Sequence, residues 1–397
     1  MPNENLFGAK RAKFDEFYTP YHDVEKEMNA YLDFDKTVFR DKTVLLPCDD
    51  PEWSNFTKYF AQNFERLGLK KLISTSYAPD SKPQELNLQL TLFETQSPKF
   101  DKSKARANGK IYTLTRDTTS DQKINVEDLE WEYLKGDGDF RSPEVTALRD
   151  EADIIITNPP FSLFRDFLKW IFTADKKCVV IGNMNAITYK EVFPLIMGNK
   201  LWPGASAFNV SMLFRVPESF VHVDSYKSER EFEGSKVNRV AAICWFTNLD
   251  HGRRHEPLKL MTEEENIKFN KKLKGGKYKK YDNYDAIEVP FTDAIPSDYL
   301  GVMGVPISFL SKYSPDQFEI LGATQRGCHD ALPDTRKYDD YWEVKQNGVP
   351  TGSSGGKTNE NANLEENDGR KNYFTNKEGR VIQSAYQRIF IKHRKTV

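Results

Sequence analysis

Short apolar runs alternate with helix-like segments along the first 250 residues of the chain. The run at 42–47, "KTVLLP", predicts a strand, and apolar residues at three- and four-residue spacing in 54–69 predict the helix that follows it. The same patterns predict further strands at 70–77, 154–157, 176–183, 208–217 and 240–249, and helices at 144–151, 162–173 and 188–198. Residues 132–140 predict a strand that runs into a glycine-rich turn. This order predicts an α/β fold with a largely parallel sheet covered by helices on both faces.

Two stretches depart from this alternation and suggest how the chain is divided. Residues 81–127 are polar and predict an insertion on the surface. Beyond residue 250 the pattern becomes mixed, and the segment 348–372 is rich in Gly, Ser, Asn and Glu, which predicts a flexible loop. We therefore expect one domain over residues 1–250 and a second over 251–397.

Composition narrows the class of protein. With 38% hydrophobic and 29% charged residues among 397, the chain is typical of a globular protein. No apolar stretch approaches the roughly 20 residues that span a bilayer, and the charged N-terminal segment is unlike a signal peptide. The four cysteines are widely separated, and Cys328-His329 has no partners at metal-ligand spacing. We expect a cytoplasmic protein with reduced thiols, no membrane contact and no metal site.

The predicted strand at 154–157 ends in an unusual turn, Asn158-Pro159-Pro160-Phe161. Proline fixes its own φ and keeps the preceding residue out of the helical region, so this turn should be stiff. In parallel sheets, ligands bind at the carboxyl ends of strands. There, the side-chain oxygen of Asn158 and the carbonyl of Pro159 could accept both protons of a ring amine, and Phe161 could stack on the ring. Such positioning would prepare the nitrogen for attack. The alternative is a plain turn.

Three motifs in chain order resemble those of amino-group DNA methyltransferases that use S-adenosylmethionine. They are "DEFYTP" at 15–20, "GDGDF" at 136–140 and "TNPPF" at 157–161. The surrounding sequence, including "CDDPEWSNFTKYFAQNF" and "GVMGVPISFL", is similar to the EcoRI-type adenine-specific DNA methyltransferase family. The resemblance covers most of residues 11–325 and resumes at "RIFIK" near the end of the chain.

This resemblance implies a fold, an activity and a partner. The fold would be a Rossmann-like class I S-adenosylmethionine-dependent methyltransferase domain over 1–250, followed by a C-terminal DNA-recognition region over 251–397. The activity would be methyl transfer to N6 of adenine in double-stranded DNA, as the protective half of a restriction-modification system. A target inside a duplex would have to be flipped out of the helix. We expect a monomer that needs no stable protein partner, although a cognate endonuclease could belong to the same system.

The resemblance also implies residue roles. Thr19 would hydrogen-bond the methionine portion of the cofactor, and Asp139 would hold its adenine amino group, with Asp137 as the competing candidate. The full assignment gives cofactor contacts to Phe17, Tyr18, Thr19, Pro20, Asp139 and Phe140, and catalysis to Asn158, Pro159, Pro160 and Phe161. Surface turns are the alternative explanation of the first two motifs.

One position departs from the general pattern of amino methyltransferases. A glycine-rich turn usually follows the first strand, where backbone approaches the cofactor closely. Here residues 47–51 read "PCDDP" without a glycine, a substitution that the EcoRI-type subfamily shares. Asp49 and Asp50 are therefore both candidates for cofactor contact, and the sequence leaves open which of them faces it.

Contacts to DNA are predicted from charge and from aromatic residues. The lysine-rich run at 268–280 could contact phosphates or could be a solvated face. Trp202 and Phe208 could stack on a flipped base or pack in the core. The DNA-binding candidates are Lys271, Lys272, Lys274, Lys277, Trp202 and Phe208.

Other functions also fit the "NPPF" sequence. The acceptor could be cytosine N4, RNA or a protein amide, although a protein amide would not call for the basic run after residue 250. A non-catalytic DNA-binding protein with a lapsed cofactor pocket is a further alternative, suggested only by the missing glycines.

Overall fold

The computed structural model describes two compact units. The described residues are 19–49, 54–78, 97–119, 121, 123–124, 126–206, 208, 210–215, 230–232, 235–273, 276–324, 335–366, 371–384 and 387–394. Unit 1 comprises Met1–Ala186 with Trp202–Gly252, and unit 2 comprises Ile187–Leu201 with Arg253–Val397. No helix in these described ranges is long and apolar enough to cross a membrane.

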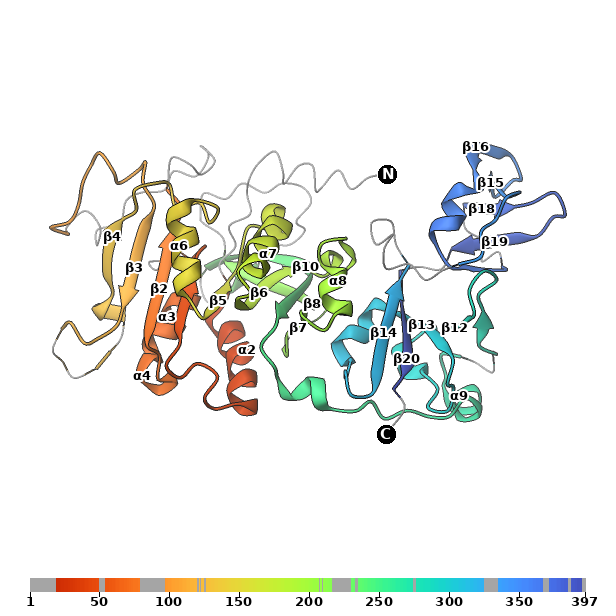
Figure 1. Ribbon diagram of the computed structural model, residues 1–397, viewed down its shortest axis with the longest axis horizontal. Helices are drawn as coiled ribbons and strands as arrows, with labels where there is room; N and C mark the ends of the chain where they lie inside the picture. Colours follow the sequence, from red (N-terminus) through yellow and green to blue (C-terminus); the bar gives the residue numbers. More distant parts are fainter. Residues whose placement is uncertain are drawn as a thin grey trace. The chain divides into compact units, whose positions relative to one another are not determined.

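Unit 1 is built on a mixed sheet with the strand order β4-β3-β2-β1-β5-β6-β10-β7, and β8 and β9 also pair with β10 (Figure 1). The pairs β1–β2, β1–β5 and β5–β6 are parallel, whereas β2–β3, β3–β4 and all pairs of β10 are antiparallel. The strands are β1 (Thr43–Leu46), β2 (Lys71–Ser76), β3 (Lys110–Leu114), β4 (Glu130–Tyr133), β5 (Ile154–Thr157), β6 (Lys177–Asn183), β7 (Trp202–Pro203), β8 (Val210–Arg215), β9 (Arg230–Phe232) and β10 (Ser235–Thr247).

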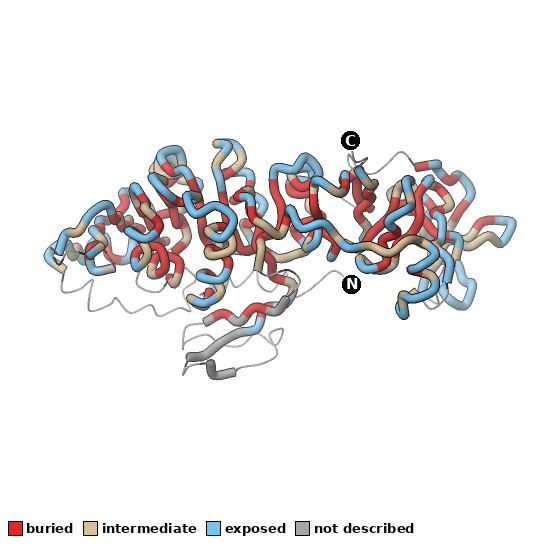
Figure 2. The backbone as a smooth tube through the Cα atoms, turned by 90° about the horizontal axis from the view of Figure 1, so that it is seen from below, coloured by how far each residue is buried: buried red, intermediate tan, exposed pale blue. Residues whose placement is uncertain are grey.

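Helices cover both faces of the parallel strands. Every residue of β1 and β5 is buried, and successive side chains of a strand point to opposite faces. Val44 and Leu46 pack in one hydrophobic cluster with residues of α2 (Tyr21–Phe34) and α3 (Asn55–Gln62). On the opposite face, α6 (Pro143–Glu151) packs against β1 and α7 (Phe164–Thr173) against β6. In Figure 2, stretches of backbone coloured red for buried residues alternate with exposed stretches in pale blue. Burial on both faces explains the continuous apolar runs in the sequence.

Local signals explain where the helices of unit 1 begin and end. Ser54 caps α3 by accepting a hydrogen bond from the N–H of Phe56, and Ser142 caps α6 in the same way through Val145. The short α4 (Phe64–Leu67) ends at Gly68, whose φ of 64° lies in the left-handed region that glycine adopts without strain. These caps are the expected Ser and Gly signals of helix ends.

The structure corrects several predictions. The sheet is mixed, because only its central strands are parallel. Residues 110–114, within the predicted surface insertion, form β3 and extend the sheet. The predicted helix at 188–198 is reduced to α8 (Phe193–Met197), preceded by the 3-10 helix η4 (Met184–Thr188). The overall α/β class agrees with the prediction.

Unit 2 contains two smaller sheets, β11-β12-β13-β20-β14 and β16-β15-β18-β19-β17. The predicted loop at 348–372 contains regular structure, namely β16, the 3-10 helix η9 (Gly355–Glu360) and β17. Residues 367–370 of that segment lie outside the described residues. The elements are α9 (Glu263–Phe269), β11 (Lys279–Lys280), β12 (Ala286–Glu288), β13 (Val302–Pro306), β14 (Phe318–Ala323), β15 (Trp342–Lys345), β16 (Pro350–Ser354), β17 (Asn363–Leu364), β18 (Asn372–Thr375), β19 (Val381–Ser384) and β20 (Arg388–His393).

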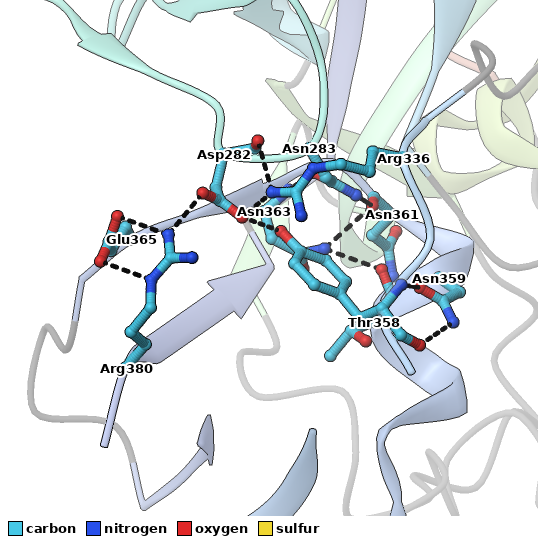
Figure 3. A network of polar contacts seen from close by, with 10 residues as sticks. Asp282, Asn283, Arg336, Thr358, Asn359, Asn361, Asn363, Glu365 and Arg380 are labelled. Atoms are coloured by element: carbon cyan, nitrogen blue, oxygen red, sulfur yellow. Dashed lines mark hydrogen bonds and ion pairs between the residues drawn. The ribbon is translucent and has the colours of Figure 1, made fainter. Parts of the chain in front are cut away.

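The second small sheet is an insertion into the first. β14 and β20 pair directly, and all of β15–β19 lies between them in the chain. Asp282, which precedes β12, holds the insertion through its carboxylate, which accepts hydrogen bonds from Arg336, Arg380 and Tyr338 at 2.6–2.9 Å (Figure 3). The backbone N–H of Asp282 also donates to the carbonyl of Asn363.

Candidate active site

The carboxyl ends of β1, β2, β5 and β6 meet at one edge of the sheet in unit 1, because these strands run parallel. Asn158 follows β5 at this edge, and Asp49 lies three residues beyond β1, which is the direct neighbour of β5. The predicted catalytic loop and one predicted cofactor residue therefore lie side by side.

The Asn158–Phe161 turn leads directly from β5 into helical structure. Pro160 has φ −54° and ψ 122°, and its carbonyl accepts a hydrogen bond from Leu163 at 2.9 Å. Phe161 begins the 3-10 helix η3 (Phe161–Leu163), which continues into α7. Asn158 is half-buried, Pro159 is buried, and the amide oxygen of Asn158 is also buried. The turn is thus confined on both sides by regular structure.

The ring of Phe161 lies against the core of unit 1. It is half-buried and packs on the cluster formed with α2 and α3. The ring of Phe214 on β8 meets it edge-on, with centroids 6.5 Å apart and an interplanar angle of 75°. This contact gives the Phe161 ring a braced orientation beside Asn158.

Asp49 is buried, and hydroxyl groups surround its carboxylate. Oδ1 accepts from Ser54 Oγ at 2.7 Å, and Oδ2 accepts from Thr157 Oγ1 at 2.5 Å. The hydroxyl of Ser74 on β2 donates to the backbone carbonyl of Asp49. These bonds join the ends of β1, β2 and β5 to the N-terminus of α3.

Thr19 is also held at the N-terminus of α3. Its carbonyl accepts from Asn55 Nδ2 at 2.8 Å, so the consecutive residues Ser54 and Asn55 hold Asp49 and Thr19 respectively. Thr19 is buried, and its Oγ1 has no hydrogen-bond partner within the part of the chain that the structure describes. Pro20 immediately precedes α2. A buried hydroxyl of this kind calls for a partner, since an unsatisfied buried polar group is costly.

The "GDGDF" loop is packed against the end of β2. Gly138 has φ +85°, and a Cβ there would collide with the carbonyl oxygen of Ser76, so only glycine fits. The N–H of Ala78 donates to the carbonyl of Asp137 at 2.7 Å. The loop therefore lies beside the first residues after β2, at the same edge of the sheet as Asp49.

Asp139 and Phe140 in this loop have different surroundings. The Asp139 carboxylate remains partly exposed and binds Arg141 through Nε at 2.9 Å and a terminal nitrogen at 2.6 Å. The hydrogen bonds and charge of Arg141 hold the pKa of Asp139 below its ordinary value, although partial burial opposes this shift. Phe140 is buried, with Phe167 and Trp170 of α7 at centroid distances of 5.0 and 5.6 Å. Its ring thus belongs to the core beneath the loop.

The DNA-binding candidates are distributed over both units. Lys271, Lys272 and Lys277 are exposed in unit 2, and Lys272 binds Asp293 at 3.0 Å. Trp202 in unit 1 is buried and donates its indole N–H to Leu249 at 3.1 Å, as expected of a core residue. Phe208 is half-buried. Four further predicted site residues lie outside the described residues, namely Phe17, Tyr18, Asp50 and Lys274.

Several residues of this site escaped the sequence reasoning. Thr157 is one, although it directly precedes Asn158. Ser54 stands before a helical run, a recognisable capping signal, but nothing in that signal reveals its bond to Asp49. Within the described ranges, no group of three or more His, Cys, Asp and Glu residues could hold a metal ion.

Comparisons with known proteins identify the family of this chain. The family model described as "Adenine-specific methyltransferase EcoRI" matches residues 5–394. The chain is 43% identical over 324 residues to the type II methyltransferase M.EcoRI of Escherichia coli, covering 80% of this chain and 89% of that protein. It is 34% identical over 315 residues to M.MpnI of Mycoplasma pneumoniae, covering 79% and 83%.

A third relative is M.MgeORF184P of Mycoplasma genitalium, which is 34% identical over 343 residues, or 86% of this chain and 92% of that protein. No solved structure matches the chain. The family model extends over nearly the whole chain, and the relatives agree with it. The chain therefore belongs to the EcoRI family of adenine-specific DNA methyltransferases, whose methyl donor is S-adenosylmethionine.

Proposed function

We propose that Asn158–Phe161 is the catalytic loop with which this methyltransferase modifies N6 of adenine at one short sequence in duplex DNA. The observation that carries this assignment is the placement of the loop. It follows β5 at the carboxyl edge of the parallel strands, beside Asp49, the Thr19 segment and the Asp139 loop. Ligands of open α/β sheets bind at this edge.

The residues at the edge fit S-adenosylmethionine. The buried hydroxyl of Thr19 lacks a partner among the described residues and could bond the methionine portion. The partly exposed carboxylate of Asp139 offers acceptors for an amino group, and Gly138 lets its loop approach the end of β2 closely. When bound, S-adenosylmethionine supplies an electrophilic methyl group.

The protein's part in the reaction is to hold the adenine amino group in position. The amide oxygen of Asn158 and the carbonyl of Pro159 would accept its two protons, so that the nitrogen lone pair is no longer delocalised into the ring. Both prolines restrict the turn, and the acceptors would need little rearrangement during the reaction. Phe161, braced by Phe214, would stack on the flipped base. Fixed dipoles and orientation of this kind supply large rate enhancements without a strong base.

Unit 2 is the proposed DNA-recognition region. Its exposed Lys271, Lys272 and Lys277 lie in one lysine-rich segment, and contacts between lysine and phosphate provide much of the affinity for DNA. With this region the enzyme would act as the protective methyltransferase of a restriction-modification system, as a monomer on double-stranded DNA.

A methylation assay with single-residue variants tests the catalytic assignment. Purified protein, plasmid DNA and S-adenosylmethionine carrying a tritiated methyl group should yield N6-methyladenine at one sequence motif. Asn158→Ala should reduce the rate by at least about 10²–10³, the usual cost of losing one preorganised hydrogen bond. Cofactor and DNA binding, measured on the same variant, should persist. Near-normal turnover of Asn158→Ala would show that the Asn158–Phe161 loop is not the catalytic loop.

A further inference from the structure

The buried Asp49 lies between the catalytic loop and the segment that carries Thr19. We propose that Asp49 is a positioning residue, which sets the direction of Asn158 by holding the hydroxyl of Thr157, and that it does not bind the cofactor. This inference rests on the proposed catalytic role of Asn158. It assigns a function to Thr157, which lies at the end of β5.

The contacts of the carboxylate support this role. Oδ2 accepts from Thr157 Oγ1 at 2.5 Å, and Oδ1 accepts from Ser54 Oγ at 2.7 Å. Asp49 and Ser54 are largely buried and Thr157 is wholly buried. A buried hydrogen bond of this kind is costly to remove, because the remaining partner is left without water to replace it. Each oxygen of the carboxylate is thus engaged by the protein itself, in a position that faces the neighbouring strand end.

The bond acts at the residue from which the Asn158–Phe161 loop leaves β5. Asn158 precedes a proline, Pro159 has a fixed φ, and Pro160 leads into η3. Thr157, the last residue of β5, is already paired with Val180 of β6. Its side-chain hydrogen bond to Asp49, which lies in the turn after β1, ties the same residue to the other neighbouring strand end. Since a misplacement of about 1 Å can cost about 10² in rate, the bond should matter for catalysis out of proportion to its effect on stability.

The same carboxylate couples the catalytic loop to the cofactor side of the site. Ser54, which binds Oδ1, is followed by Asn55, whose side chain holds the carbonyl of Thr19 at 2.8 Å. The path from Thr157 to Thr19 therefore runs through Asp49 and two consecutive residues at the start of α3. Asp49 would fix the distance between the methyl acceptor and the methyl donor without touching either.

Three variants test the inference. Thr157→Val removes the hydroxyl and keeps the shape, Thr157→Ser keeps the hydroxyl as the matched control, and Asp49→Asn replaces one carboxyl oxygen with an NH2 donor. We expect Thr157→Val and Asp49→Asn to slow methyl transfer in a single turnover at saturating cofactor and DNA by about 10–10². Thr157→Ser should recover most of the rate. The dissociation constants for S-adenosylmethionine and DNA should stay close to those of the wild type.

A double variant makes the test specific to the pair. If the two side chains act through one bond, the rate of Asp49→Asn with Thr157→Val should be close to that of either single variant, not the product of the two losses. Multiplied losses would overturn the inference. Should Thr157→Val fail to fold, Asp49→Asn with the same rate and binding measurements decides the question.

Two further outcomes would also overturn it. A normal rate in Thr157→Val would remove any positioning role. Weaker binding of S-adenosylmethionine to Asp49→Asn with an unchanged saturated rate would make Asp49 a cofactor ligand. Neither result would contradict the catalytic role of the loop, because Asn158→Ala tests that assignment separately.

Discussion

The carboxylate of Glu27 accepts a hydrogen bond from the backbone N–H of Ser206 at 2.7 Å, although these residues lie 179 positions apart in the chain. Glu27 is fully buried on α2 and also accepts from the N–H of Ala205 at 2.8 Å and the hydroxyl of Tyr31 at 2.6 Å. The turn after β7 is thereby fixed to the helix that begins directly after Thr19 and Pro20.

Replacing Glu27 should destabilise unit 1. Glu27→Ala leaves the half-buried N–H groups of Ala205 and Ser206 without their acceptor, and the loss of a buried acceptor costs about 1–3 kcal/mol. Glu27→Gln keeps one acceptor oxygen and should lose less. Urea unfolding measures the free energy, and the exposed Glu25 on the same helix provides the control Glu25→Ala. Equal stability of Glu27→Ala and Glu25→Ala would show that the bonds to the turn contribute nothing.

The carboxylate of Asp139 is expected to serve the cofactor. Asp139→Ala removes an ionised acceptor, whose hydrogen bond is worth about 1.5–3 kcal/mol, so the affinity for S-adenosylmethionine should fall about tenfold or more. DNA affinity in the absence of cofactor should not change. Isothermal titration calorimetry distinguishes this role from that of Asp137, whose Ala variant would show the larger loss if the two assignments were exchanged.

The insertion in unit 2 should loosen at low pH through Asp282. Burial raises the pKa of this carboxyl, but the hydrogen bond from Tyr338 and the charges of Arg336 and Arg380 outweigh burial and hold it below the ordinary value of 3.8 (Figure 3). A lowered pKa stabilises the folded state above the unfolded-state pKa, and this contribution disappears as the pH falls through the folded-state pKa.

Asp282→Asn tests this pH dependence. The wild type should be more stable than the variant above about pH 4, where the unfolded carboxyl is ionised. The two melting temperatures should converge as the pH falls below that value. A constant difference across the whole range would mean that the charge of Asp282 is not what holds the insertion.

The lysine-rich segment should contribute to the salt dependence of DNA binding. Replacing Lys271, Lys272, Lys274 and Lys277 together with Ala should weaken binding at low salt and reduce the log–log slope by roughly one for each lost phosphate contact. Lys272 already binds Asp293, so we expect its share to be the smallest of the described three. Four lysines exposed on unit 1, replaced together with Ala, provide a control with the same change in charge. If the slope of the Lys271, Lys272, Lys274 and Lys277 variant equalled that of the wild type, the segment would be a solvated face that does not contact phosphate. The control lysines are Lys36, Lys70, Lys102 and Lys104.

The sequence predicted those features that depend on local pattern. The continuous apolar run of β5 and the turn at Asn158 are examples, because a strand buried on both faces leaves no polar alternation. β3 was missed because its side chains alternate between buried and half-buried positions within a polar stretch. The spacing of apolar residues therefore predicts most of the strands and helices of unit 1. It does not predict β3, which pairs antiparallel with β2.

Contacts between distant residues could not be predicted in the same way. The bond between Asp49 and Thr157 joins residues 108 positions apart. It depends on β5 lying next to β1, a strand order that the pattern of apolar residues does not specify. Phe140 illustrates a different limit. Its motif predicts a contact with the cofactor, whereas its burial against Phe167 depends on how α7 packs.

The ring of Phe161 should affect capture of the target base more than the chemical step. Phe161→Ala removes a stacking surface worth about 1–3 kcal/mol per base, whereas Asn158→Ala leaves that surface in place. Emission from 2-aminopurine at the target adenine rises when the base leaves the stack. We expect a normal rise with Asn158→Ala and a different emission with Phe161→Ala, together with weaker DNA binding and slower turnover.

Phe214→Leu is the matched test of the contact that orients Phe161, because it keeps an apolar contact but removes the edge-on ring at 6.5 Å. The 2-aminopurine emission with Phe214→Leu should fall between that of the wild type and that of Phe161→Ala, since the stacking ring remains but is less firmly oriented. Wild-type emission from Phe161→Ala would assign the stacking surface to another residue and leave Phe161 a core residue.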